Sequence, residues 1–312
     1  MKVHYLLDLV QMAAPTSENI LGLIGNTPMV RINNMVNKKG VEIYAKLEGS
    51  NPTGSIKDRI AVSMIEAAIK DGRLTKGKTI IEATSGNTGI SLAMIGRVLG
   101  YEVVIVMSKA VSIERQKMIK AFGGEIVLTP AEEGTDGAIR KCRQLVKENP
   151  DKYFNPDQFS NNFNPIAHYE NTAEEIWQQT DGKITHIVCA LGTSGTIMGV
   201  GEALRKKNPK IKIIEAQPTE GHYIQGLKNM QEAIVPSIYH PERIDEHIMI
   251  ESEEAFEISR QIALKEGILV GMSAGAAMLA AMKVSEKIEK GLIVAIFADR
   301  GEKYLSTDLF KV

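Results

Sequence analysis

The stretch N-P-T-G-S-I-K-D-R, residues 51–59, decides the fold of this chain when it is taken with the loops that follow it. A loop with proline and glycine leads directly into a predicted helix over 57–71, on which Ile60, Met64 and Ala67 share one face. Lys57 therefore stands at the entrance of a helix. A lysine in that position is usually a solvated surface charge, so the segment needs support from the rest of the sequence.

The chain outside this segment alternates between short apolar runs and helical patterns. The predicted strands cover 41–47, 79–83, 103–107, 125–128, 184–190, 211–216 and 292–297. The further predicted helices cover 87–99, 112–123, 134–147, 195–207, 252–266 and 274–289. Such alternation predicts an α/β fold, in which mainly parallel, twisted sheets are flanked by helices.

The length of 312 residues predicts two lobes, because single cores usually stop growing below this size. The segment 149–165 is rich in asparagine and proline and marks the boundary between them. We expect a smaller, mobile lobe over 51–161 and a larger lobe formed by 22–50 together with 162–312. Residues 1–21 form an extension, whose start (MKVHYLLDLVQMAA) we interpret as an amphipathic helix rather than a signal peptide.

Composition excludes several classes of protein. Lys plus Arg total 37 and Asp plus Glu total 38, so we expect neither a nucleic-acid partner nor an anionic membrane surface. The longest uncharged stretch, 267–282, is too short for a membrane span and contains several glycines. Cys142 and Cys189 lie far apart without a metal-binding motif, which indicates a reducing cytoplasm and no metal site.

Three further segments lie where a predicted strand turns into a helix, at which unpaired N–H groups favour anions. A-T-S-G-N-T-G (83–89) suits a carboxylate, and G-T-S-G-T (192–196) suits a phosphate. In V-G-M-S-A-G-A (270–276), Ser273 lies between small residues, as if a planar group lay against it. Each segment alone also fits ordinary structure, namely Asn87 or Ser273 as a helix cap, or a tight turn at 192–196.

Taken together and in this order, the four segments resemble the β-family of pyridoxal-phosphate enzymes, also called fold type II, from about Leu21 to Leu309. The resemblance implies pyridoxal 5'-phosphate as the cofactor and a homodimer as the assembly. It implies that Lys57 carries the cofactor and acts as the catalytic base, that Asn87 binds its ring oxygen and that Ser273 meets its pyridine nitrogen. The residues implied to hold its phosphate are Gly192, Thr193, Ser194, Gly195 and Thr196, and those implied to hold the substrate carboxylate are Thr84, Ser85, Thr88 and Gln158.

Within this family, further segments are similar to those of the cysteine synthases. They include LIGNTPMV (23–30), SIERQKMIKAFG (112–123) and NPIAHYENTAEEIW (164–177). QPTEGHYIQGLKN (217–229) and ADRGEKYLST (298–307) are similar to the B type, although Ala298 replaces a cysteine found in some members. This implies β-replacement on O-acetyl-L-serine by sulfide, giving L-cysteine and acetate through an internal aldimine, an external aldimine and an aminoacrylate.

The sulfur donor and the activated serine stay open. Lys228 occupies a place where related enzymes often carry arginine, so it either attracts thiosulfate or O-phosphoserine or is a surface lysine. The alternatives on the same scaffold are a cystathionine β-synthase-like enzyme and a cysteine-consuming enzyme that produces sulfide. A serine dehydratase is disfavoured by the sequence SGNTG, and a catalytically silent binding protein by the presence of Lys57, Asn87 and Ser273.

Overall fold

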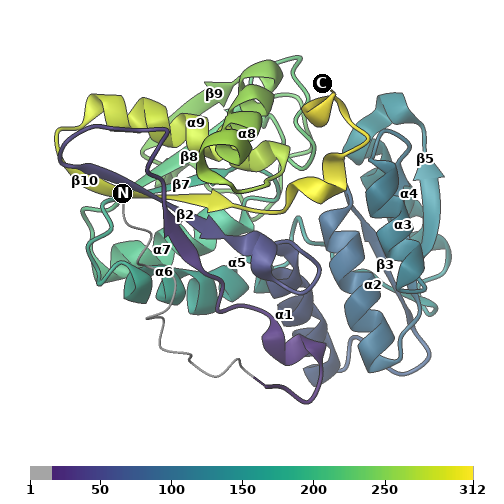
Figure 1. Cartoon of the computed structure of the whole chain (residues 1–312). Helices are drawn as coiled ribbons and strands as arrows, with labels where there is room; N and C mark the ends of the chain where they lie inside the picture. The colour runs from purple at the N-terminus through teal and green to yellow at the C-terminus, as the bar shows by residue number, and fades with distance from the viewer. Residues whose placement is uncertain (1–15, 312) are drawn as a thin grey trace.

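The structure is a computed structural model that describes residues 16–311. Its strands form two sheets that lie side by side, a larger one on the left of Figure 1 and a smaller one on the right. The amphipathic helix expected at the start of the chain lies outside the described residues.

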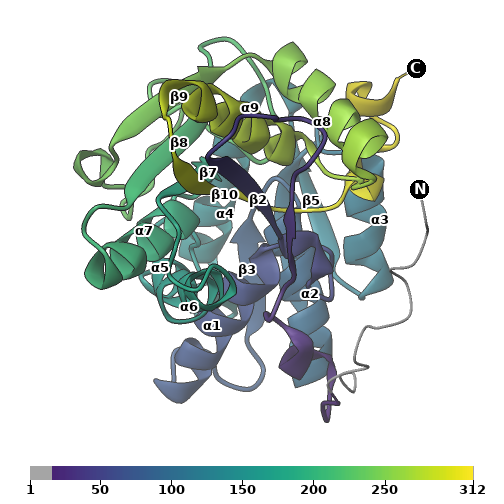
Figure 2. The ribbon, with the colours of Figure 1, turned by 60° about the vertical axis from the view of Figure 1, so that its left-hand side comes forward.

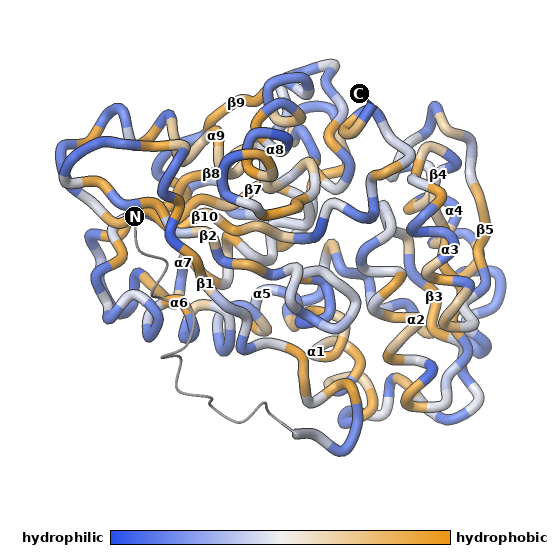
Figure 3. Tube along the Cα trace, in the orientation of Figure 1, coloured by the Kyte–Doolittle hydropathy of each residue, from blue (hydrophilic) through white to orange (hydrophobic). Residues whose placement is uncertain are grey.

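The larger sheet has six strands in the order β1-β2-β10-β7-β8-β9. Their bounds are Met29–Arg31 for β1, Val41–Leu47 for β2, His186–Ala190 for β7, Lys212–Pro218 for β8, Glu246–Ile250 for β9 and Gly291–Phe297 for β10. All neighbours run parallel except β1, which pairs antiparallel with β2. Figure 3 shows the apolar character concentrated along the inner strands of both sheets.

Helices cover both faces of the larger sheet because its strands alternate their side chains between the two faces. In β10, Ile293 and Ala295 pack with α8 (Ser252–Glu266) and α9 (Met272–Lys287). Val294 and Ile296 pack with α6 (Ala173–Gln179) and α7 (Gly195–Lys207) on the other side. Figure 2 shows α6 and α7 on the opposite side of the sheet from α8 and α9. A short helix α5 (Phe163–Ala167) and a π-helical turn over His168–Thr172 precede α6.

The smaller sheet has four parallel strands in the order β5-β4-β3-β6. Their bounds are Thr79–Ala83 for β3, Val103–Ser108 for β4, Glu125–Thr129 for β5 and Tyr153–Phe154 for β6. Its flanking helices are α2 (Asn87–Leu99), α3 (Ile113–Ala121) and α4 (Gly134–Glu148). The helix that starts at Lys57, α1 (Lys57–Lys70), packs against both α2 and α5 and thereby connects the two halves of the molecule.

The structure confirms the predicted class of a mainly parallel α/β fold, and the predicted strands and helices are present within a few residues. Sequence patterns missed β1, β6 and β9, of which the first two have only three and two residues. The interpretation of Asn87 as a helix cap is wrong, because the capping position belongs to Gly86 and Asn87 is the first helical residue. Within residues 16–311, no helix has both the length and the apolar character that a membrane crossing requires.

Candidate active site

The carboxyl ends of strands from both sheets face one cleft, as is usual for ligand sites in parallel α/β proteins. The loops after β3 and β7 meet there with the first turns of α1 and α9. The predicted site residues that line this cleft are Lys57, Thr84, Ser85, Asn87, Thr88, Gln158, Gly192, Thr193, Ser194, Thr196, Lys228 and Ser273. Gly195 belongs to the same loop, between Ser194 and Thr196.

Lys57 begins α1 and points its half-buried side chain toward the cleft. Burial lowers the pKa of its amine to about 8, and the carboxylates of Asp299 and Glu48 partly oppose this shift. A substantial fraction of the amine is therefore neutral near pH 8, so that it can act as a nucleophile or a base.

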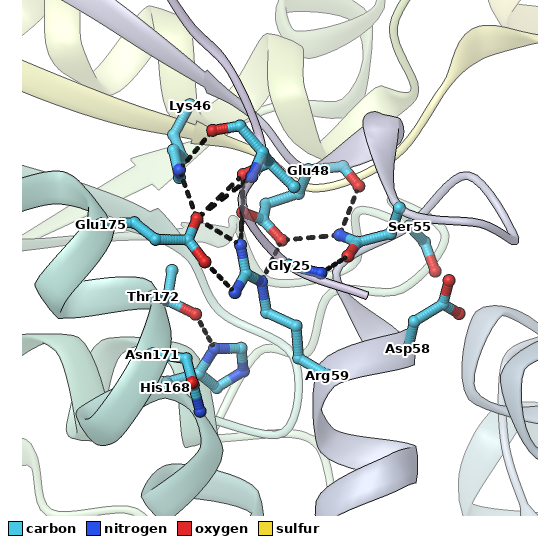
Figure 4. Close-up of polar contacts among 12 residues, drawn as sticks. Gly25, Lys46, Glu48, Ser55, Asp58, Arg59, His168, Asn171, Thr172 and Glu175 are labelled. Atoms are coloured by element: carbon cyan, nitrogen blue, oxygen red, sulfur yellow. Dashed lines mark hydrogen bonds and ion pairs between the residues drawn. The ribbon is translucent and has the colours of Figure 1, made fainter. Parts of the chain in front are cut away.

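A network of charged side chains around Arg59, two residues after Lys57, joins α1 to β2 and α6 (Figure 4). Arg59 binds Glu48 (Nε to Oε2, 2.7 Å) and Glu175 (Nη1 to Oε1, 2.7 Å). Lys46 donates to the other oxygen of Glu175 at 2.6 Å and to the carbonyl of Thr27 at 2.7 Å. We call Lys46, Glu48, Arg59 and Glu175 the rear network, in which two cations balance two carboxylates.

The loop over 192–196 is shaped to hold an anion. Ser194 adopts a left-handed backbone conformation (φ 70°) at the N-cap of α7, and its buried hydroxyl has no partner among the described residues. A Cβ at Gly192 would lie 2.5 Å from the carbonyl oxygen of Gly226, so this position requires glycine. The free amides of the helix start and the unpartnered hydroxyl together form a cradle of the kind that binds phosphate.

Two buried polar residues that sequence analysis missed support this loop from behind. Asn164 donates from Nδ2 to Thr193 Oγ1 at 3.0 Å, and His168 Nε2 lies 3.1 Å from Thr196 Oγ1. His168 Nδ1 is 3.0 Å from Thr172 Oγ1, so both ring nitrogens are engaged. Burial holds the pKa of His168 well below 6.5, and Lys57 and Arg59 contribute in the same direction. The imidazole is therefore neutral at neutral pH.

The loop after β3 presents the start of α2 to the same cleft. Gly86 has φ 128°, and a Cβ there would lie 2.3 Å from Arg115 Cδ, so the turn depends on glycine. Thr88 donates to Gln158 Oε1 at 2.6 Å, and Gln158 Nε2 donates to the carbonyl of Ala83 at 2.9 Å. These bonds join Thr88 and Gln158, two of the four residues predicted to hold a carboxylate, at the start of α2.

A cluster of five residues connects Asn87 to the C-terminal segment of the chain. Asp299 Oδ2 accepts from Asn87 Nδ2 at 2.7 Å, from Tyr304 at 2.8 Å and from Arg115 Nη2 at 3.3 Å. Lys303 Nζ donates to Asn87 Oδ1 at 2.9 Å. We call Asn87, Arg115, Asp299, Lys303 and Tyr304 the cleft cluster. Of these five residues, the sequence pattern predicts only Asn87 as a site residue.

Ser273 and Ala298 line another wall of the cleft. Ser273 is the second residue of α9 and is 7% exposed, which leaves its hydroxyl little contact with bulk solvent. Ala298 lines the same wall, and Cys189 lies there with 1% exposure. Burial raises the pKa of the Cys189 thiol, so it remains protonated and acts as part of the apolar wall.

Lys228 is not the solvated surface lysine considered from the sequence. It is 8% exposed, and its Nζ donates to Asp136 Oδ1 at 2.7 Å and to the carbonyl of Ile234 at 3.3 Å. Its ammonium also lies 5.0 Å from the centre of the Phe159 ring. The charge at this edge of the cleft is therefore balanced by a carboxylate from α4.

With this geometry established, comparison with known proteins identifies the family. Residues 20–299 match the family described as pyridoxal-phosphate dependent enzyme. The chain belongs to that family. This confirms the sequence-based expectation of a fold type II enzyme with pyridoxal phosphate as its cofactor.

Relatives cover nearly the whole chain. It is 49% identical to the cysteine synthase of Aquifex aeolicus (94% of this chain, 92% of the relative) and 43% identical to cysteine synthase B of Pseudomonas aeruginosa (93% and 97%). Among solved structures, cysteine synthase (OASS) from Entamoeba histolytica has a TM-score of 0.89 and 44% identity (97% and 94%). A hydrogen sulfide-producing enzyme from Fusobacterium nucleatum has a TM-score of 0.88 and 44% identity (93% and 100%).

The described residues fit this cofactor. The cradle over 192–196 matches its phosphate, and the unpartnered hydroxyl of Ser194 offers one more donor. The described part of the chain provides no hydrogen-bond partner for Lys57 Nζ, which therefore remains available for the covalent link to the cofactor. Asn87 and Ser273 line the space between these two points.

Proposed function

We propose that the protein is a B-type cysteine synthase, which replaces the acetate of O-acetyl-L-serine with sulfide to form L-cysteine. One observation carries the proposal: the Lys57 amine faces the same cleft as an anion cradle at α7 and a second helix start with hydroxyl groups at α2. The first matches a phosphate and the second a carboxylate. The names of the relatives agree with this activity.

Lys57 has two tasks in the proposed reaction. Its Nζ would hold the cofactor, and once freed by the substrate amine it would remove the proton from the substrate Cα and later return a proton there. Its pKa of about 8 makes it an effective base near neutral pH. Bound pyridoxal phosphate supplies an electron sink for the charge left at Cα.

The other predicted residues bind and orient. Gly192, Thr193, Ser194, Gly195 and Thr196 hold the phosphate through the loop amides and hydroxyls. Thr84, Ser85, Thr88 and Gln158 hold the substrate carboxylate at the start of α2, where the helix dipole favours an anion. The hydroxyl of Ser273 would lie at the pyridine nitrogen without enforcing its protonation, as an aspartate would, and this would favour loss of the β-leaving group over transamination.

The substrate proposal follows from the charge balance at Lys228. Because Asp136 already pairs with its ammonium, Lys228 is not a free cation at this edge of the cleft, which favours the uncharged acetyl ester over a phosphate ester. Thiosulfate and O-phosphoserine are proposed as secondary substrates, for which Lys228 would have to exchange its partner.

We further propose that residues 51–161 move as a smaller lobe, that the enzyme is a homodimer and that it works in the cytoplasm. Contacts across the cleft that support a closing motion are Lys228 with Asp136 and Arg115 with Gln225. Both cysteines are free and buried, in agreement with a reducing compartment.

A steady-state comparison tests the proposal. O-acetylserine with sulfide is assayed beside O-phosphoserine with sulfide, O-acetylserine with thiosulfate, serine with homocysteine, and cysteine alone. We expect the highest kcat/KM for O-acetylserine with sulfide. A higher value for release of sulfide from cysteine would overturn the proposal in favour of a cysteine-consuming enzyme.

A further inference from the structure

The side chain of Asn87 lies between two oppositely charged partners. Lys303 Nζ donates to Asn87 Oδ1 at 2.9 Å, and Asn87 Nδ2 donates to Asp299 Oδ2 at 2.7 Å. Both partners are buried, with exposures of 3% for Lys303 and 2% for Asp299. Hydrogen bonds to ionised groups in such surroundings are stronger than those between neutral groups.

These two partners allow only one orientation of the amide. If the amide were turned by 180°, its NH₂ group would face the ammonium of Lys303 and its oxygen would face the carboxylate of Asp299. Both contacts would then be repulsive. An amide has one oxygen and two N–H groups, so after these two bonds one N–H remains. Asn87 lines the cleft, and this N–H is the group left for a ligand there.

Lys303 is itself held in place. Its Nζ also donates to the carbonyl of Gly54 at 3.2 Å, in the loop that leads to Lys57. Its backbone carbonyl accepts from Ser112 Oγ at 2.8 Å, at the start of α3. Lys303 is not among the residues that line the cleft, so it acts on a ligand through the residues it contacts, and of its two Nζ partners only Asn87 lines the cleft.

The Lys303 amine remains mostly protonated at neutral pH although it is buried. Burial lowers the pKa of its amine to about 8, and Asp299 opposes this shift. The other charged groups that face it are Arg115, which favours loss of the proton, and Asp58 and Glu302, which oppose it. The ammonium form therefore predominates at neutral pH.

We propose that Lys303 is a positioning residue, which together with Asp299 orients the Asn87 amide so that an N–H, and not the carbonyl, faces the ring oxygen of the cofactor. This inference rests on the proposed placement of the cofactor against Asn87. An N–H donor stabilises the ring oxygen as an anion, with the proton on the neighbouring nitrogen. A carbonyl at the same place would favour the protonated oxygen instead.

The two protonation states absorb at different wavelengths, so the holoenzyme reports the orientation directly. Lys303→Met removes the ammonium and keeps most of the chain volume, while Lys303→Arg keeps the charge and the donor. Lys303→Gln provides a second neutral variant in case the methionine variant does not fold. Lys46→Met is the matched control, because Lys46 is also fully buried but binds Thr27, Glu175 and Gln179 outside the cleft.

We expect the ratio of the visible to the near-ultraviolet band to fall roughly tenfold in Lys303→Met or Lys303→Gln, the effect of losing one charged hydrogen bond. Lys303→Arg should keep the band ratio of the parent protein. Lys46→Met should lower the stability of the protein and leave the band ratio unchanged. An unchanged ratio in the folded neutral variants, with loss of stability alone, would overturn the inference.

Asn87→Ala distinguishes an error in the orienting role of Lys303 from an error in the proposed placement of the cofactor. If Asn87→Ala shifts the bands and the Lys303 variants do not, the cofactor lies against Asn87 but Lys303 does not orient it. If Asn87→Ala also leaves the bands unchanged, the placement of the cofactor is wrong and the inference falls with it.

Discussion

The rear network and the cleft cluster are both buried and charged, yet they differ in the balance between cations and carboxylates. In the rear network, Lys46 and Arg59 offset Glu48 and Glu175, and each charged group has a close partner. In the cleft cluster, Arg115 and Lys303 face the single carboxylate of Asp299, and Arg115 Nε and Asp299 Oδ1 have no partner among the described residues. A balanced network holds its elements in place, whereas an excess of positive charge beside a cleft suits an anionic ligand.

The largest effect on stability is expected when one cation of the rear network is removed. Arg59→Met leaves Glu48 without its cation at full burial, and removal of one partner of a buried pair costs about 3–5 kcal/mol. Urea unfolding of the holoenzyme should show this loss in the free energy of unfolding.

Arg140→Met is the control for this experiment. Its pair with Glu133 is exposed (59% and 42%), and such pairs contribute about 0–1 kcal/mol. Similar losses in the two variants would show that the rear network has no special role in stability.

On the cleft side, we expect a change in substrate binding rather than in stability. Gln158→Ala and Thr84→Ala should each raise KM for O-acetylserine roughly tenfold, the effect of losing a hydrogen bond to a carboxylate. Cofactor affinity should change much less, because the proposed partner of both residues is the substrate. The exposed Ser160→Ala serves as the control, and an equal loss of cofactor affinity would assign both residues to the cofactor instead.

His168 lies between the rear network and the cradle over 192–196: its Nε2 is 3.1 Å from Thr196 Oγ1, and the charges of Lys57 and Arg59 act on its ring. Its pKa is lowered in the folded protein, so between that value and 6.5 only the unfolded chain takes up the proton. The contribution to stability is therefore present above about pH 6.5 and is lost as the pH falls, by about 1.4 kcal/mol at pH 5.5.

The measurement is the free energy of unfolding at pH 7.5 and 5.5 for the parent protein and for His168→Gln. The variant should lose about 1.4 kcal/mol less on acidification. His240→Gln, at an exposed histidine (44%), should lose as much as the parent. Equal losses in all three proteins would refute the role of His168.

Much of the site could be predicted from sequence because its chemistry is local. The loops 83–89 and 192–196 follow strands and begin helices, and this context, taken together with the segments 51–59 and 270–276, predicts anion binding. The cleft cluster could not be found this way, because Lys303 and Asn87 are 216 positions apart and meet only through the fold. The same holds for Asp136, which is 92 positions from Lys228. Only the fold shows that Lys228 is paired with a carboxylate and is not a free charge.

The smallest effect on activity is expected for a change at Lys228, because its ammonium is already paired with Asp136. Lys228→Ala leaves Asp136 without its cation, so rates with thiosulfate or O-phosphoserine should fall more than the rate with O-acetylserine and sulfide. Lys147→Ala, exposed on the same helix as Asp136, is the control. A parallel fall in all reactions, or none, would exclude a role of Lys228 in substrate choice.

The central claim is that Lys57 carries the cofactor, and one chemical experiment tests it. Lys57 lines the cleft, and Lys303 lies buried behind Asn87; burial lowers the pKa of both amines to about 8, so Lys303 is the internal comparison for this experiment. The holoenzyme is reduced with borohydride, digested and mapped by mass spectrometry. We expect the pyridoxyl group on Lys57, whereas a pyridoxyl group on Lys303 or on any other lysine would contradict the account.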